Sequence, residues 1–159
     1  MKKKFHVIGI ASYIASNIPA GSKEISNRSW NPEFGLNASY RPEYFAVDIS
    51  ASYVLSDIAG KPEKKAGEIF NLNTAISGQI PLSKNSGSSL SPVLEMTYSS
   101  QAKGQANPAN NIIFLSPGTS FIYNNLALEI LIQIPVLQSD EENVMKQESR
   151  LITGVKFLF

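Results

Sequence analysis

The chain has 159 residues, of which 43% are hydrophobic and 17% are charged, and its formal net charge is +1 at pH 7. Soluble domains carry about 25% charged residues, so this chain has fewer charged residues than a typical water-exposed surface. The near-neutral balance and the scattered basic residues give no reason to expect nucleic acid as a partner. The absence of cysteine excludes disulfides, thiolate metal sites and cysteine nucleophiles. The length suits one domain, residues 1–159.

Catalytic chemistry has little to build on in this sequence. His6 is the only histidine, and a lone histidine near a terminus is usually an ordinary strand residue. No paired-carboxylate motif, phosphate-binding glycine loop or nucleophile constellation can be assembled. We therefore predict that the protein is not an enzyme and holds neither a metal nor a cofactor.

The first element falls at residues 5–18. Three lysines followed by FHVIGIASYIA are similar to a secretory signal, but polar residues dilute the apolar part and no clean A-x-A cleavage site follows. A β-strand is the favoured interpretation, because a strand here completes an even number. The chain has no run of about 18 apolar residues, which excludes a transmembrane helix.

Alternation of apolar and polar residues predicts seven more strands. The clearest is LALEILIQIPVLQ, in which Leu128, Ile130 and Ile132 share one face while Glu129 and Gln133 share the other. The predicted strands, in chain order, are residues 5–18, 34–40, 45–53, 70–80, 94–99, 113–123, 126–138 and 150–159.

The connections alternate between long and short. Long connections are expected near residues 21–33, 57–68, 101–111 and 139–149, and shorter ones at 41–43, 83–89 and 124–125. Membrane barrels alternate short periplasmic turns with longer outer loops in this way. We therefore predict an all-β fold: an antiparallel up-and-down transmembrane β-barrel of about eight strands in the bacterial outer membrane.

The polar face of the predicted strands is mostly amide, hydroxyl and small residues with isolated charges, which suits a confined, hydrated interior. The candidates for a lumen-facing position are Asp48, Asn71, Asn73, Gln79, Glu95, Glu129, Gln133 and Lys156. Arg150 falls on the same face. Because Glu129 and Lys156 lie on adjacent strands, we expect them to pair. Such charges either satisfy one another in a narrow lumen or line a permeation path.

Aromatic residues fall mainly near strand ends on the apolar face, as in the girdles at the two bilayer interfaces. They are Phe34, Tyr40, Phe45, Tyr53, Phe70, Tyr98, Phe121, Tyr123, Phe157 and Phe159. The alternative interpretation is a soluble sandwich or a lipocalin-like ligand carrier, in which the apolar face points inward.

The last strand carries a more specific pattern. Gly154 followed by Phe157 and Phe159 resembles the C-terminal strand signature that the bacterial barrel-assembly machinery reads. Ile152 departs from it, because that position is usually polar. The resemblance implies outer-membrane lipid and the assembly machinery as partners.

A wider resemblance covers most of the chain loosely. The segments IGIASYIASNIPAGSKE, FLSPGTSFIYNNLALEILIQIPV with its turn-like Pro-Gly break, and RLITGVKFLF are similar to outer-membrane proteins grouped under the meta-pathway of phenol degradation. Those porin-like proteins are larger, with additional strands. The resemblance implies either a complete small barrel or the C-terminal part of a larger one. It also implies a channel or transporter for small hydrophobic or aromatic compounds, and the alternative is a closed structural or adhesive barrel.

Overall fold

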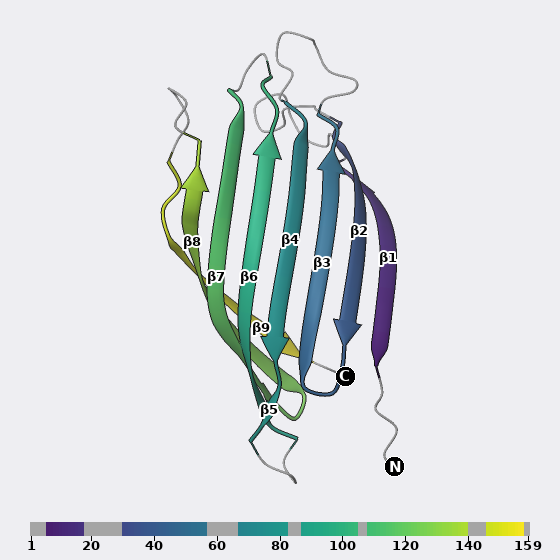
Figure 1. Ribbon diagram of the computed structural model, residues 1–159, viewed down its shortest axis with the longest axis vertical. Helices are drawn as coiled ribbons and strands as arrows, with labels where there is room; N and C mark the ends of the chain where they lie inside the picture. The colour runs from purple at the N-terminus through teal and green to yellow at the C-terminus, as the bar shows by residue number, and fades with distance from the viewer. Residues whose placement is uncertain are drawn as a thin grey trace.

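The computed structural model describes residues 6–17, 30–56, 67–82, 87–104, 108–139 and 146–157, and within these ranges the fold is one antiparallel β-sheet (Figure 1). Its strands are β1 (Val7–Ser16), β2 (Pro32–Arg41), β3 (Phe45–Val54), β4 (Ile69–Gly78), β5 (Ile80–Pro81), β6 (Ser89–Gln101), β7 (Asn110–Tyr123), β8 (Leu126–Gln138) and β9 (Arg150–Phe157). Eight are long, and the two-residue β5 pairs only with β6.

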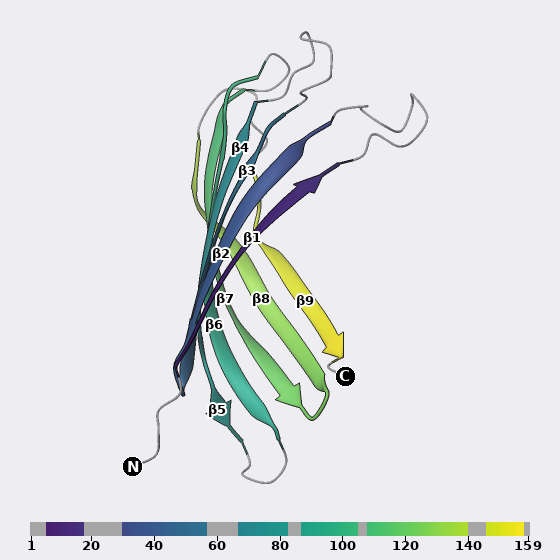
Figure 2. The same cartoon turned by 90° about the vertical axis from the view of Figure 1, so that its right-hand side faces the viewer.

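The sheet is a simple meander. Its order is β1-β2-β3-β4-β6-β7-β8-β9, so each long strand lies antiparallel beside the next one in the chain. The predicted all-β, up-and-down architecture is confirmed. The sheet is open, because β1 and β9 form its two edges and do not pair with each other. Figure 2 shows the strong twist that carries β8 and β9 away from the plane of β1 to β4.

The strand register separates two faces. One row across β1, β2, β3, β4 and β6 reads Ile10, Ala38, Ile49, Thr74 and Met96. The next row, one residue along each strand, reads Ala11, Asn37, Ser50, Asn73 and Thr97. Because successive side chains of a strand point to opposite sides, these rows belong to opposite faces. We call them the apolar face and the polar face.

A tight turn joins β7 and β8. Asn124 adopts a φ of 52°, in the left-handed region that asparagine tolerates better than most residues. The predicted two-residue connection at 124–125 is therefore confirmed, and it sets the register in which Tyr123 faces Leu126.

Three strand details differ from the sequence-based expectation. β4 ends at Gly78, so Gln79 lies in the break before β5 and not on a strand face. β6 extends over Ser89–Gln101, well beyond 94–99. The Pro117–Gly118 pair is no turn, because β7 runs through it and keeps its register with β6.

A β-bulge in β8 lies next to a proline. The register between β7 and β8 shifts between Ile113 and Phe114, whose partners are Leu137 and Pro135, so Val136 is an extra residue on β8. Pro135 cannot donate a hydrogen bond, and bulges are among the places where a sheet accepts proline.

Phe159 and most of the predicted long connections lie outside the described residues.

Candidate functional site: the polar face of the sheet

Charge on the strands is confined to one face. The register and the alternation put all seven strand Asp, Glu, Lys and Arg residues on the polar face: Glu33, Arg41, Asp48, Glu95, Glu129, Arg150 and Lys156. The apolar face of the eight long strands carries no charged side chain. Among the predicted lumen candidates on strands, the register brings Asp48, Asn71, Asn73, Glu95, Glu129, Gln133 and Lys156 to this one face.

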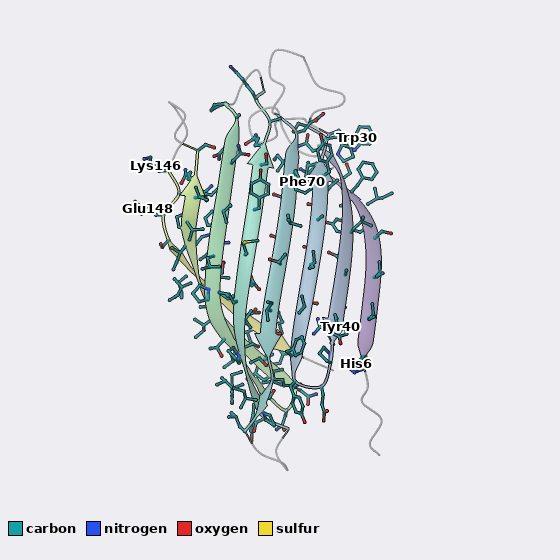
Figure 3. The ribbon with its side chains drawn as sticks, in the orientation of Figure 1. His6, Trp30, Tyr40, Phe70, Lys146 and Glu148 are labelled. Atoms are coloured by element: carbon teal, nitrogen blue, oxygen red, sulfur yellow. The ribbon has the colours of Figure 1, made fainter. Side chains whose placement is uncertain are left out.

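The polar face is also the sheltered one. The buried hydrophobic side chains of the described strands all lie on it: Ala46, Ile112, Phe114, Ala127 and Leu131. Gln133 is only 7% exposed there, whereas Ile10 and Ile130 on the apolar face are 80% and 51% exposed. This is the reverse of a soluble sheet, in which the apolar side is the covered one. Figure 3 shows the side chains on the sheet.

Amides and hydroxyls form a ladder across three strands of the polar face. Ser99 on β6 donates its hydroxyl to Asn71 Oδ1 on β4 at 2.8 Å, and the Asn71 amide donates to Ser52 on β3 at 3.4 Å. Two residues further along β4 on the same face, the Asn73 amide donates to the Ser50 hydroxyl at 3.3 Å. Since the partners are small and polar, this part of the face is suited to water and leaves room above the sheet.

Two ion pairs lie on the same face. Lys156 Nζ on β9 lies 2.9 Å from Glu129 Oε2 on β8, so the predicted pair is confirmed. It runs diagonally, since Lys156 is directly opposite Ala127 and Glu129 is opposite Gly154. Arg41 Nη2 and Asp48 Oδ1 lie 2.8 Å apart at the end of β2 and the start of β3. Both pairs are partly exposed, so their contribution to stability is small.

Arg150 has a different partner set. Its Nε donates to Gln133 Oε1 at 2.5 Å, and its guanidinium lies 5.5 Å from the centroid of the buried Phe114 ring. The neighbouring Ser116 is 1% exposed, and its hydroxyl has no hydrogen-bond partner among the described residues. The β7 and β8 part of the polar face is thus more deeply buried than the β2–β4 part.

A hollow of about 520 Å³ opens over β1, β2, β3, β4 and β6. Its walls include the polar-face side chains Asn37, Ser39, Asp48, Ser50, Asn73, Glu95 and Thr97, with Gly9, Ala11 and Ala75 between them. The small residues create the space, and the amides, hydroxyls and carboxylates give it hydrogen-bonding capacity.

The apolar face has aromatic residues toward both ends and aliphatic residues between them. Phe34, Tyr53 and Phe70 are direct cross-strand neighbours at the end near the long connections, and Phe70 packs edge-to-face on Tyr98. Tyr40 and Phe45 pack edge-to-face at the other end. Figure 3 shows Phe70 and Tyr40 at opposite ends of the sheet.

Some contacts were not predicted from the sequence. Tyr13 on β1 donates its hydroxyl to Glu33 Oε1 on β2 at 2.8 Å, and Tyr53 donates to Glu68. The partner of Asp48, Arg41, was also missed, because it lies at the last position of β2, in what looked like a turn. Extending the predicted strand 34–40 by one residue would have placed Arg41 on the same face as Asp48 and indicated the pair.

The described ranges hold no group of three or more His, Asp or Glu side chains that could bind a metal ion. No helix in them is long and apolar enough to cross a membrane. No protein-family model, curated protein or solved structure matches the chain. The resemblance to the phenol meta-pathway group therefore stays a prediction from the residues themselves.

Proposed function

We propose that the protein is a β-barrel of the bacterial outer membrane whose polar face lines a passage for small solutes. The observation that carries this proposal is the segregation of charge: all seven strand charges lie on the polar face, and the opposite face exposes aliphatic side chains. Facing hydrocarbon, the exposed apolar side chains need no further cover, whereas each Lys or Arg there would cost about 2–4 kcal/mol at the bilayer midplane.

The dimensions of the apolar face support the same proposal. Phe45 and Tyr53 are eight positions apart on β3, about 27 Å along a strand that rises roughly 3.4 Å per residue. A tilt of about 40° reduces this span to about 20 Å along the barrel axis, close to the roughly 25 Å apolar band of outer-membrane barrels. Aromatic residues toward both ends of this span suit the two lipid–water interfaces.

In this proposal the sheet edges close in the membrane. Unpaired backbone groups of an edge strand are too costly in hydrocarbon to remain exposed, so β1 and β9 must gain neighbours there. The two edges run antiparallel, which permits them to pair directly in an eight-stranded barrel. Further strands between them would give the larger barrel that the family resemblance implies.

Barrel width decides between a channel and a closed barrel. The interior of an eight-stranded barrel is just wide enough for side chains to fill it. Small residues such as Gly9, Ala11 and Ala75 around the hollow favour an open passage over a filled interior. The buried Phe114 and Leu131 near β9 favour the alternative of a closed structural or adhesive barrel. Small hydrophobic or aromatic compounds are the solutes that the family resemblance implies.

Assembly is the other part of the proposal. Gly154 and Phe157 lie on β9, the edge strand, and with Phe159 they form the segment proposed to contact the barrel-assembly machinery. Phe157 is exposed on the apolar face, next to the end of the sheet where the short turns lie. An exposed aromatic at an unpaired edge is accessible to a protein partner before the barrel closes.

Two measurements on refolded protein test the proposal. In SDS gels, a membrane barrel migrates as a compact species until it is heated, whereas a soluble carrier with an apolar pocket stays monomeric without detergent. Planar-bilayer recordings then separate the two barrel types: a channel gives discrete conductance steps, and a closed barrel gives flat traces. A protein that remains monomeric in buffer without detergent would contradict the membrane proposal.

A further inference from the structure

Glu95 stands apart from the other charged side chains of the polar face. Arg41 pairs with Asp48, and Lys156 pairs with Glu129. Arg150 donates to Gln133, and Glu33 accepts the Tyr13 hydroxyl. Six of the seven charges therefore have a partner. Among the described residues, Glu95 is the charged strand side chain that makes neither a hydrogen bond nor an ion pair. Of the two carboxylates that line the hollow, Asp48 has a cationic partner and Glu95 has none.

The position of Glu95 places this charge at the hollow. Glu95 lies in the middle of β6, directly opposite Ala75 on β4, and it forms part of the wall. Because Ala75 is small, no neighbouring side chain on β4 covers the carboxylate from that side. Glu129 and Lys156 form an ion pair with each other, so neither serves as a direct partner of Glu95.

The rest of the wall supplies neutral hydrogen-bonding groups. Thr97, Asn73 and Ser50 form one row beside Glu95, and their hydroxyl and amide groups can replace part of the water around a solute. A volume of about 520 Å³ falls in the range of small-molecule sites, roughly 300–1,000 Å³.

We propose that this hollow binds small organic cations and that Glu95 is the residue that determines this preference. The ammonium group of the solute contacts the Glu95 carboxylate, and polar groups of the solute hydrogen-bond to the amide and hydroxyl wall. A carboxylate without a cationic partner in the wall of a hollow raises the local concentration of cations and lowers that of anions. The claim that cations pass through the protein rests on the proposed channel function. The claim that the hollow binds them requires only the folded sheet.

The binding test uses protonated ethanolamine as the probe and ethylene glycol as its neutral counterpart, with protein refolded in detergent micelles. NMR titration should show saturable shifts at Asn73 and Thr97 with ethanolamine and none with ethylene glycol. Glu95→Gln should weaken binding by about tenfold or more, as expected for loss of a charge partner. The control Glu148→Gln removes the same charge from an exposed position before β9, outside the hollow, and should leave binding unchanged.

Three results would overturn the proposal: no saturable shift in the original chain, equal binding by Glu95→Gln, or equal weakening by Glu148→Gln. Glu95→Asp keeps the charge and should retain most of the binding. Compact migration in unheated SDS gels shows for each variant that a loss of binding is not a loss of fold.

Ion selectivity separates this proposal from the channel proposal. Under a KCl gradient in planar bilayers, the permeability ratio of K⁺ to Cl⁻ should exceed unity and fall toward unity in Glu95→Gln. Discrete conductance with no cation preference would overturn the role of Glu95 while leaving the channel intact. Flat traces would contradict the channel, and the titration in micelles would then decide the binding proposal by itself.

Discussion

The ring of Tyr13 on β1 lies directly over Gly35 on β2, its cross-strand partner. A Cβ atom at position 35 would sit only 2.1 Å from Tyr13 Cε1. Gly35 is buried, and the Tyr13 hydroxyl reaches past it to Glu33. An aromatic ring that covers a glycine on the next strand replaces the side-chain contact that the glycine lacks. The pair therefore ties the edge strand β1 to the sheet.

Gly35→Val should destabilise the sheet through this contact. The added side chain forces the far end of the Tyr13 ring away and breaks its hydrogen bond to Glu33. We expect the free energy of unfolding to fall by about 1 kcal/mol, the low end of overpacking costs, because the ring end can swing aside. Urea unfolding in detergent measures the change. The same substitution made in a Tyr13→Ala background should cost much less, and an equal cost in both backgrounds would reject the contact.

Lys156→Glu should destabilise the last hairpin. The substitution places a second carboxylate beside Glu129, where the ammonium now lies 2.9 Å away. Because the Lys156 side chain is 67% exposed, screening limits the expected loss to about 1 kcal/mol. The thermal midpoint in detergent should fall, and it should recover in the charge-swapped double variant Glu129→Lys, Lys156→Glu. An unchanged midpoint in the single variant would refute the pairing.

Lysine substitutions at two consecutive positions of β3 should have unequal effects. Ile49 is on the apolar face and Ser50 is on the polar face. In the membrane proposal, Ile49→Lys exposes a charge to hydrocarbon and should lower the free energy of folding into bilayers by about 2–4 kcal/mol. Ser50→Lys should have little effect, because its side chain enters a hydrated space. Equal losses, measured by urea unfolding in lipid vesicles, would contradict the assignment of the two faces.

Phe157→Ala should slow assembly without weakening the finished sheet strongly. The proposed signal needs the aromatic on β9, while the exposed Phe157 ring adds little buried contact to the sheet. Folding catalysed by reconstituted barrel-assembly machinery should slow, whereas spontaneous folding into detergent should not. Tyr123→Ala removes an exposed aromatic at the same end of the sheet but from β7, and it should leave catalysed folding unchanged. Equal slowing by both variants would reject a specific signal.

Strands and their faces could be predicted because both are local properties of the chain. Apolar and polar residues alternate along Leu126–Gln138, and this two-residue period assigns Ile130 and Gln133 to opposite faces. The Glu129–Lys156 pair followed from the same alternation plus the adjacency of the last two strands. Asp48, Glu95 and the asparagines of β4 reached the polar face for the same reason.

Two features could not be predicted: whether the sheet closes into a barrel, and where strands end or continue through proline. Both depend on the curvature of the sheet and on neighbouring strands. No local pattern says whether β1 meets β9, which depends on the twist and stagger accumulated over all the strands. Pro117 looked like a break, yet β7 continues through it with Leu94 of β6 opposite. Gly78 ended β4 two residues earlier than expected, which removed Gln79 from the face to which alternation had assigned it.

The most direct test of the account asks which face of β3 meets hydrocarbon. The chain has no cysteine, so single cysteines can be placed one at a time from position 47 to position 52 and labelled with a small fluorophore. In vesicles that contain brominated lipids, labels at 47, 49 and 51 should be quenched strongly, and those at 48, 50 and 52 weakly. Quenching that does not alternate along β3, or that is strong at 48, 50 and 52 and weak at 47, 49 and 51, would contradict the claim that the apolar face meets hydrocarbon.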